Sequence, residues 1–405
     1  MTSVRMRGRS VTCRPMPHAA LDGLLVADFS RVLAGPLCTQ TLGDLGADVV
    51  KVERPETGDD TRQWGPPFVD EGSTYYLGLN RNKRSLVLDL RDETDNALAQ
   101  ELCARADVVL ESFRPGAMER LGLGYAAVRS RNPGVIYTSI SAFGSGEPTR
   151  GLPGYDLLVQ AMSGYMSITG APDGHALKPG TALADMLTGL YATIGTLAAL
   201  QARERSGTGQ HVEVSLMDSA LASLLNLGSS FLNTGVVPGR SGNRHPSIAP
   251  YETFAAADRD IALAGGNDVI FERLCGVLGR PELAHDPRFA TNADRVGNRE
   301  ALGAELEAAF AGDTAEAWAE RLNAAGVPAG PVNDVGEAFA LAERLGLEPV
   351  AELDGVRTAR SPLRLSETPA RSRLRPPRLG EHDGELRAWL SRPEPPAPGG
   401  STSGA

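Results

Sequence analysis

The sequence predicts an α/β protein with a Rossmann-like, doubly wound parallel sheet in a large domain, together with a smaller α+β domain. Two observations predict this architecture. Apolar runs of strand length alternate with helical segments through the first half of the chain, and strands in such a repeat become buried between two layers of helices. From about residue 250 the pattern changes to shorter strands and helices. The 405 residues are enough for two or three domains with sizeable cores.

Three consecutive segments predict the first strand–helix–strand unit. Residues 24–29 form an apolar strand, 35–46 a helix with Pro36 in its first turn, and 48–53 a second strand. Proline suits a first helical turn because the N–H that it lacks has no partner there. The intervening turn, SRVLAGP, lacks the GxGxxG pattern, so we do not expect a bound NAD although Glu53 closes the second strand with an acid.

Four further apolar segments extend the predicted sheet, and an apolar helix precedes the last of them. These strands are expected at 85–90, 106–112, 134–141 and 211–216. Ligands of a doubly wound parallel sheet bind outside the carboxyl ends of its strands. Side chains that follow the strands are therefore the first candidates for a functional site.

Composition changes along the chain predict its domain organisation. The first residues contain four arginines and no acid, but they lack the apolar stretch of a secretion signal, and translation from Met16 is an alternative start. The last residues are rich in Pro, Gly and Ser, which favours disorder. The expected segments are a disordered tail (1–18), the first part of the large domain (19–225), a linker (226–250), the small domain (251–325), a linker with a return to the large domain (326–390) and a disordered tail (391–405).

Charge and cysteine content exclude several classes of partner. Forty Lys and Arg stand against fifty Asp and Glu, and the net charge of −10 disfavours nucleic acid or an anionic membrane as the main partner. No uninterrupted apolar run reaches the roughly eighteen residues of a membrane span. The four cysteines lack metal-ligand spacing, so neither a metal site nor a disulfide framework is expected. A cytoplasmic location fits this composition best.

One acid stands out because its neighbours are small and apolar. Asp185 lies in TALADMLTGL, close to the start of the predicted apolar helix. Asp is a favoured helix N-cap because its oxygens accept the first backbone N–H groups, so a structural cap is the simpler interpretation. A chemical role for the carboxylate is the alternative.

Seven segments, in unbroken order over about residues 20–390, resemble the family III CoA-transferases. The segments are RVLAGPLCTQTLGDLGADVVKVERP, NRNKRSLVLDL, ADVVLESFRPGAMERLGLGY, GYDLLVQAMSGYMSITG, ALADMLTGL, AAGVPAGPVND and PRLGEHDGELRAWL. Within the family, GDDTRQWGPPFV and HPSIAPYETF are most similar to dicarboxylate-using members such as succinyl-CoA:glutarate CoA-transferases. The resemblance implies an interlocked homodimer.

The resemblance assigns the nucleophile to Asp185. A carboxylate can attack an acyl-CoA thioester to give a mixed anhydride, and the released CoA can then form an aspartyl-CoA thioester. The implied donor is succinyl-CoA, and the implied acceptor is a short dicarboxylate such as glutarate, itaconate or malate. CoA is then a substrate, with no permanently bound cofactor and no metal.

The resemblance also assigns binding residues. CoA is expected to contact residues that follow the strands: Val32, Leu33, Ala34, Arg54, Leu88, Arg91, Ser112, Phe113, Arg120 and Leu121. The acyl pocket is expected to include Tyr155, Asp156 and the turn of Gly265, Gly266 and Asn267. A cation should meet the distal carboxylate of a diacid, and Arg62, Arg244 and His245 are the candidates. A structural or surface role is the alternative for each of them.

Two other functions remain open at the level of sequence. The related α-methylacyl-CoA racemases use a His in a GHD-like segment, where this chain has GYD at 154–156. Tyrosine is a much weaker base than histidine at neutral pH. A non-catalytic CoA-binding protein is the other alternative, and thioester exchange with a labelled acid discriminates among the three.

Overall fold

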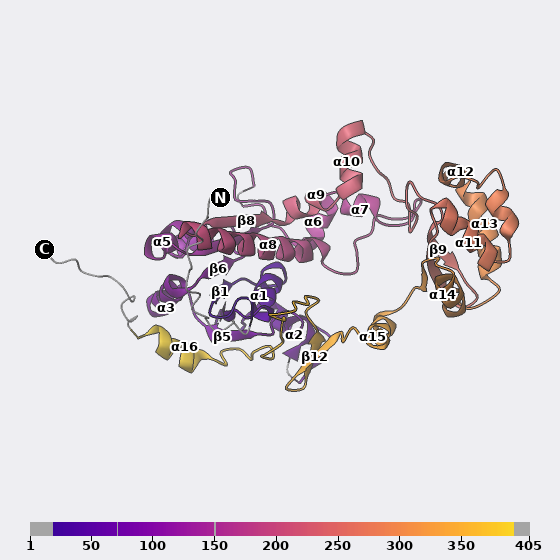
Figure 1. Ribbon diagram of the computed structural model, residues 1–405. Helices are drawn as coiled ribbons and strands as arrows, with labels where there is room; N and C mark the ends of the chain where they lie inside the picture. Colours follow the sequence, from indigo (N-terminus) through magenta and orange to yellow (C-terminus); the bar gives the residue numbers. More distant parts are fainter. Residues whose placement is uncertain (1–18, 71, 150, 393–405) are drawn as a thin grey trace, which may run out of the picture. The chain divides into compact units, whose positions relative to one another are not determined.

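A computed structural model of the chain describes residues 19–70, 72–149 and 151–392. It divides into two compact units (Figure 1). Unit 1 contains the chain up to Val159, residues 182–223 and the chain from Val350; unit 2 contains 160–181 and 224–349. The stretch 160–181, expected within the large domain, thus groups with unit 2. The tail predicted at 1–18 lies outside the described residues, as do residues 393–405 of the tail predicted at 391–405.

Unit 1 is built on a six-stranded parallel sheet in the order β5-β2-β1-β6-β7-β8. Its strands are β1 (Leu25–Phe29), β2 (Asp48–Glu53), β5 (Lys83–Val87), β6 (Val108–Glu111), β7 (Ile136–Ser141) and β8 (His211–Ser215). In the central register, Ala27 lies opposite Val50 on one side and Val109 on the other. The strand order reverses at β1 and β6, so a crevice is expected outside their carboxyl ends. The predicted parallel sheet is confirmed.

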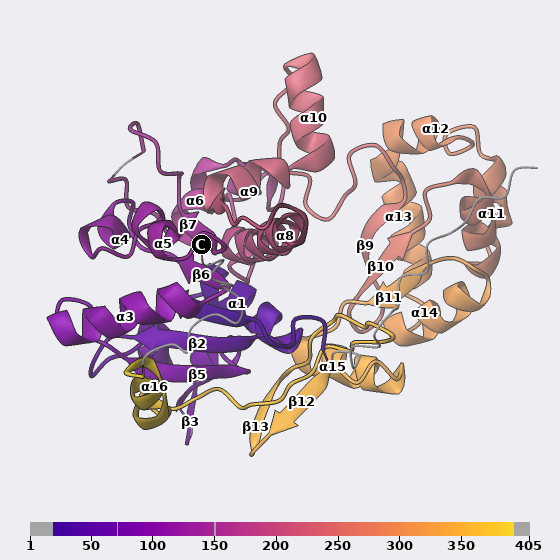
Figure 2. The same cartoon turned by 60° about the vertical axis from the view of Figure 1, so that its left-hand side comes forward.

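Helices cover both faces of this sheet (Figure 2). Right-handed crossovers place the helix between β1 and β2 on the opposite face from the helices that connect β5 to β6 and β6 to β7. One face carries α1 (Ala34–Asp44) and α8 (Leu183–Ser206), and the other carries α3 (Glu93–Arg105), α5 (Tyr125–Arg131) and α16 (Asp383–Leu390). The C-terminal helix α16 buries Leu386 and Leu390 in the same core as Leu102 of α3.

Helix α8 is the most apolar long helix of the described chain. Among the described residues it is the one helix whose length and composition would suit a membrane span, with a mean hydropathy of 1.4. It packs against α1, β7 and β8 inside unit 1. This packing accounts for the apolar residues on the buried face of the helix.

The shorter elements of unit 1 lie mainly in the connections. They are η1 (Asp60–Gln63), β3 (Phe68–Val69), β4 (Gly72–Ser73), α2 (Thr74–Leu77), α4 (Ala117–Arg120), α9 (Leu216–Ala222), β12 (Val350–Leu353) and β13 (Val356–Ala359). Helix α6 (Asp156–Met162) spans the boundary between the units.

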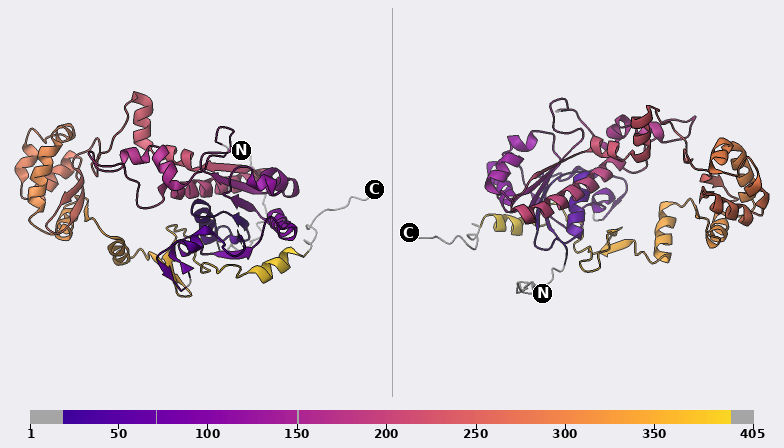
Figure 3. Two further views of the ribbon diagram at one scale, coloured as in Figure 1. Left: turned by 180° about the vertical axis from the view of Figure 1, so that it is seen from behind. Right: turned by 45° about the horizontal axis from the view of Figure 1, so that its top comes forward.

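Unit 2 has a three-stranded antiparallel sheet in the order β11-β10-β9, with helices packed on it (Figure 3, orange). Its core includes Phe254, Phe271, Phe310 and Trp318. Its elements are α7 (Tyr165–Ile168), α10 (Leu225–Thr234), β9 (Tyr251–Ala255), β10 (Asp260–Ala264), α11 (Asp268–Val277), η2 (Pro281–His285), α12 (Asn292–Gly297), α13 (Arg299–Phe310), α14 (Ala315–Ala324), β11 (Ala329–Pro331) and α15 (Val335–Arg344).

Helix α10 corrects the prediction of a linker over 226–250. The Gly/Asn/Pro-rich composition that suggested a linker begins only near the end of this helix. Gly235, at φ 72°, closes the helix in the left-handed conformation that glycine adopts without strain.

Candidate active site

Asp185 lies in the first turn of α8 but does not cap it. The N-cap position is Ala182, whose side chain has no acceptor. The first backbone N–H groups are satisfied from another helix: Asp156 Oδ1 accepts the N–H of Ala184 at 2.9 Å and that of Asp185 at 3.3 Å. The interpretation of Asp185 as a helix cap is therefore wrong, and its carboxylate is left to another role.

The surroundings of Asp185 disfavour its charged form. Burial raises the pKa of the Asp185 carboxyl to about 7, and the nearby charge of Asp156 adds to this effect. Tyr75 of α2 lies close enough that burial and then the charge of Asp185 raise the pKa of its phenol to about 12. The Tyr75 ring meets Trp64 edge to face, with ring centroids 5.2 Å apart. A protonated hydroxyl donor therefore lies near the candidate nucleophile.

Nothing in the sequence predicted Tyr75 as a site residue. It stands in an ordinary run, STYYL, far along the chain from Asp185. Only the fold places α2 near the first turn of α8.

The predicted nucleophile and the predicted CoA turn are neighbours within unit 1. Gly189 lies one helical turn after Asp185, on the same face of α8. A Cβ on Gly189 would lie 2.6 Å from the carbonyl oxygen of Ala34 at the start of α1. The missing side chain therefore lets α8 approach the turn formed by Val32, Leu33 and Ala34.

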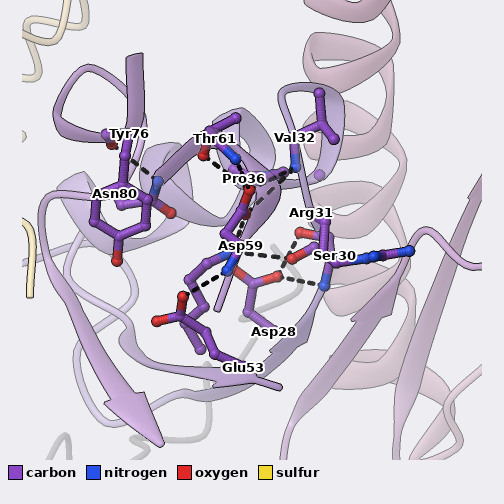
Figure 4. Close-up of polar contacts among 12 residues, drawn as sticks. Asp28, Ser30, Arg31, Val32, Pro36, Glu53, Asp59, Thr61, Tyr76 and Asn80 are labelled. Carbon is purple, nitrogen blue, oxygen red and sulfur yellow. Dashed lines mark hydrogen bonds and ion pairs between the residues drawn. The ribbon is translucent and has the colours of Figure 1, made fainter. Parts of the chain in front are cut away.

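Side chains of β1 and of the loop before η1 hold this turn in place (Figure 4). The N–H of Ser30 donates to Asp28 Oδ1 at 2.9 Å. The N–H of Val32 donates to both oxygens of Asp59, at 3.3 Å each. Val32 has a φ of 72°, in the left-handed region that a β-branched residue rarely adopts. Leu33 then forms the N-cap of α1.

The turn after β6 is tied to the same place. Ser112 Oγ accepts the N–H of Arg31 at 3.1 Å. The Arg31 guanidinium lies over the ring of Phe113, 5.5 Å from its centroid. Ser112 and Phe113 are thus brought beside the first turn, as expected for residues at the carboxyl ends of β1 and β6.

Two fully buried ion pairs lie beneath the first turn. Lys51 Nζ is 2.8 Å from Asp59 Oδ2, and Lys83 Nζ is 3.1 Å from Asp28 Oδ2. Lys51 also donates to the carbonyl oxygen of Ser30 at 2.9 Å. This cluster was not predicted from the sequence. Its signal was present, because Asp28 and Lys51 interrupt apolar strands that were themselves predicted to be buried.

The remaining predicted CoA residues lie in three different settings. Arg91, Arg120 and Leu121 line one surface hollow of about 450 Å³. Arg54 follows β2 and pairs with Asp60. Leu88 differs, because its side chain is buried in the core of the sheet.

The predicted acyl-pocket residues lie in both units. In unit 1, the Tyr155 side chain is 68% exposed, and Asp156 accepts the N–H groups of α8. In unit 2, Asn267 caps α11 by accepting the N–H of Ile270 at 2.8 Å.

The glycines of that turn have a local packing role. A Cβ on Gly266 would lie 1.9 Å from a side-chain carbon of Ile248, and one on Gly265 would lie 3.2 Å from Pro250. Buried Arg295 donates to the carbonyl oxygen of Gly266 at 2.9 Å. The turn is therefore packed tightly against its own unit.

The three candidate cations already have polar partners. Arg62 donates to both oxygens of buried Glu53 at 2.7 Å and to the Tyr76 hydroxyl at 2.6 Å, a geometry that favours a structural role.

The other two candidates lie in unit 2. Arg244 pairs at the surface with Glu252 at 2.9 Å and with Glu300. His245 Nδ1 accepts the N–H of Ser247 at 3.1 Å. Within the described parts of the chain, no group of three His, Cys, Asp or Glu side chains is arranged to hold a metal ion.

Comparison with known proteins places this geometry in a family. Residues 21–383 match the profile of CoA-transferase family III. The chain is 44% identical to the acetyl-CoA:oxalate CoA-transferase of Acetobacter aceti, covering 93% of this chain and 97% of that protein. It is 43% identical to the succinate–glutarate CoA-transferase of Agrobacterium fabrum, covering 94% and 98%.

A solved structure shares the fold as well as the sequence. The crystal structure of a CAIB/BAIF family protein from Brucella suis superimposes with a TM-score of 0.85 at 44% identity, covering 92% of this chain and 99% of that one. The chain therefore belongs to CoA-transferase family III and is a CoA-transferase.

Proposed function

We propose that the chain transfers CoA from succinyl-CoA to a short dicarboxylic acid, with Asp185 as the covalent nucleophile. The observation that carries this proposal is the position of Asp185. Its carboxyl lies in the first turn of α8, beside the turn formed by Val32, Leu33 and Ala34, and the N–H groups that it could have capped are taken by Asp156. An uncommitted carboxyl beside the proposed CoA turn is suited to attack a thioester.

In the first half-reaction, an oxygen of the Asp185 carboxylate attacks the thioester carbonyl. The carbon–sulfur bond breaks, CoA leaves as a thiolate, and a mixed anhydride joins Asp185 to the acyl group. The thiolate then attacks Cγ of Asp185, and the anhydride carbon–oxygen bond breaks. The free donor acid departs and leaves an aspartyl-CoA thioester.

In the second half-reaction, the acceptor acid reverses these steps. Its carboxylate attacks Cγ of Asp185 and releases the CoA thiolate, which gives a second mixed anhydride. The thiolate attacks the acceptor carbonyl and regenerates the Asp185 carboxylate. The exchange needs no ATP because a thioester is exchanged for a thioester, provided that water is kept from the anhydride. Burial around Asp185 supports that requirement.

The neighbours of Asp185 suit this chemistry. Each attack creates negative charge on a carbonyl oxygen, and a fixed hydroxyl donor lowers the cost of that charge. Tyr75 supplies such a donor near Asp185. Asp156 holds the first turn of α8 and therefore orients the nucleophile.

The proposed CoA site collects the residues that follow the strands. Arg91, Arg120 and Leu121 share one hollow, which offers two guanidinium groups to phosphate oxygens. Arg54, Leu88, Ser112 and Phe113 complete the proposed contacts. The pairing of Arg54 with Asp60 is partly exposed and can yield to a phosphate.

Relatives support short diacids as substrates. Oxalate, glutarate and mesaconate appear in the names of similar transferases. A buried diacid needs a cation for its distal carboxylate. Arg244 is a better candidate than Arg62, because its ion pair with Glu300 is exposed whereas Arg62 is held by buried Glu53. His245 is its neighbour in the chain. Tyr155 in unit 1 and Gly265, Gly266 and Asn267 in unit 2 are each proposed as residues that contact the acyl group.

We also propose that two chains form an interlocked homodimer. Apolar side chains that a single chain leaves exposed support this. On α10, Leu232 is 80% exposed and Leu225 is 72% exposed. On α8, Leu190, Tyr191 and Ile194 are also exposed. Such extended apolar surface is typical of an interface between subunits.

An exchange assay tests the proposed function. Enzyme, succinyl-CoA and labelled glutarate should yield labelled glutaryl-CoA, and Asp185→Asn should abolish the label transfer while CoA still binds in calorimetry. Asp218→Asn, which alters an acid in the first turn of α9, is the matched control and should keep activity. Solvent-proton exchange at the acyl α-carbon without transfer would instead indicate a racemase. Binding with neither reaction would indicate a CoA-binding protein.

A further inference from the structure

The buried ion pair of Lys51 and Asp59 takes no part in the transfer steps described above. Both side chains have no exposed surface, and their charged atoms are 2.8 Å apart. Removing two charges from water is costly, and apolar side chains of similar size often stabilise a protein as well or better. A buried ion pair at this place therefore points to a role in fixing local geometry.

The backbone beside this pair is strained. Val32 has a φ of 72°. A β-branched residue is an outlier in this left-handed region, and such a conformation persists only where surrounding contacts impose it. Val32 directly precedes Leu33, the N-cap of α1, and Ala34, the first residue of that helix. Its φ angle therefore sets the path of the chain into α1.

Asp59 is the acceptor that faces the strained residue. Both of its oxygens accept the N–H of Val32 at 3.3 Å. Its carboxylate is oriented from other sides by Lys51 and by Thr61, whose Oγ1 and N–H donate to Oδ1 at 2.8 and 3.0 Å. Burial alone would raise the pKa of Asp59, but Lys51 and these hydrogen bonds lower it to about 2. The lowered pKa favours the ionised carboxylate as the acceptor.

We propose that Asp59, oriented by Lys51 and Thr61, is a positioning residue that holds Val32 in its left-handed conformation and so shapes the turn that receives CoA. The inference rests on the proposed function, in which Val32, Leu33 and Ala34 contact CoA. Without the carboxylate, Val32 relaxes toward negative φ and displaces Leu33 and Ala34 from their binding positions. Asp59 itself touches no reacting atom.

A double-mutant cycle with Val32→Gly tests this role. Asp59→Asn keeps one oxygen but loses the second oxygen that accepts the N–H of Val32 and the charge that Lys51 orients. It should therefore raise the KM for succinyl-CoA and the Kd for CoA by about tenfold or more, because Val32 is no longer held in its strained conformation. The KM for the acceptor acid and kcat should change little. Val32→Gly alone should weaken CoA binding by about two- to fivefold or less, because glycine adopts this φ without strain. In the Val32→Gly background, Asp59→Asn should raise the Kd for CoA by a clearly smaller factor than in the wild type.

A matched control separates positioning from general stability. Asp44 is another buried acid, paired with buried Arg81 at 2.6 Å, and it contacts none of the residues of this turn. Asp44→Asn should lower the unfolding midpoint and leave the KM for succinyl-CoA unchanged. The proposal would be overturned if Asp59→Asn raised the Kd for CoA by the same factor in the wild-type and Val32→Gly backgrounds. A loss of kcat with an unchanged KM for succinyl-CoA would also overturn it.

A milder variant keeps the test decisive if Asp59→Asn does not fold. Thr61→Val removes the 2.8 Å hydrogen bond that orients the carboxylate and retains the ion pair. It should raise the KM for succinyl-CoA by a few-fold, and Val32→Gly should suppress the increase; an unchanged KM would contradict the proposal. Wild-type enzyme that binds no CoA would refute the proposed function. If Asp59→Asn binds CoA as tightly as the wild type does, only the positioning role is refuted.

Discussion

At the scale of single residues, the proposed transfer of CoA depends on the ionisation of Asp185. Burial and the neighbouring charge of Asp156 raise the pKa of its carboxyl to about 7. The carboxylate is the effective nucleophile, because protonation makes the carboxyl oxygens much weaker electron-pair donors. The same surroundings that keep water from an anhydride therefore place the titration of the nucleophile near neutral pH.

The first prediction concerns the pH dependence of transfer. The kcat/KM for succinyl-CoA should rise from pH 5 to pH 8 with a midpoint near 7, since it reports the free enzyme. Asp156→Asn removes the like charge but retains an oxygen acceptor for α8, so the midpoint should move to lower pH. Asp107→Asn, at the opposite end of the sheet, should leave the midpoint unchanged. A flat profile would refute the assignment.

The second prediction concerns stability. A carboxyl with a raised pKa in the folded state binds more protons folded than unfolded between about pH 4 and pH 7, so it lowers stability as the pH rises through this window and has its full destabilising effect above it. Asp185→Asn should therefore increase the free energy of unfolding more at pH 8 than at pH 5, by up to roughly 2 kcal/mol. Chemical denaturation at the two pH values measures this difference. An equal effect at both pH values would mean that the carboxyl is not perturbed.

At the scale of elements, the contact of α1 with α8 brings the nucleophile to the CoA turn. Gly189 permits this contact because a Cβ would lie 2.6 Å from a backbone oxygen. Backbone cannot move aside as a flexible side chain can. The close approach of these two helices is therefore a requirement for the site as well as for the core.

The third prediction is that Gly189→Ala separates these helices. It should lower the free energy of unfolding by about 1–3 kcal/mol, as overpacking does. It should also reduce the transfer activity of the protein that remains folded. Gly303→Ala is the matched control, because this helical glycine of α13 has open space around its Cβ position. There alanine should stabilise by about 0.5–1 kcal/mol. Equal behaviour of the two variants in urea unfolding would contradict the packing argument.

Much of unit 1 could be predicted at this scale, and the reason is periodicity. Each strand is an apolar run between helical segments, and all six predicted strands are present. Helix α10 was missed because glycine and serine dilute its apolar pattern. In the site, resemblance led to Asp185, but Tyr75 and the capping role of Asp156 depend on contacts between distant segments that no local pattern encodes. Asp59 was missed because its partners follow different strands.

At the scale of the whole molecule, each unit has its own core, and apolar side chains remain uncovered on α8 and α10. A chain that exposes such surface gains stability when another chain covers it. Interlocked chains would have a distinctive property, because they cannot separate unless one of them unfolds.

The fourth prediction follows from that property. The protein should behave as a dimer in light scattering, at concentrations from micromolar to nanomolar. Two differently tagged dimers mixed under native conditions should not exchange chains over hours, and they should exchange after unfolding and refolding. A monomer, or rapid exchange without denaturant, would refute interlocking and leave the chemistry at Asp185 untouched.

The covalent role of Asp185 is tested most directly by trapping the acyl-enzyme. Enzyme incubated with succinyl-CoA is treated with hydroxylamine, which converts an activated carboxyl to a hydroxamate, and is then mapped by peptide mass spectrometry. The account predicts a hydroxamate on Asp185, dependent on succinyl-CoA and absent when the acyl-CoA is omitted. Modification of a different acid, or full transfer activity with no modification of Asp185, would contradict it.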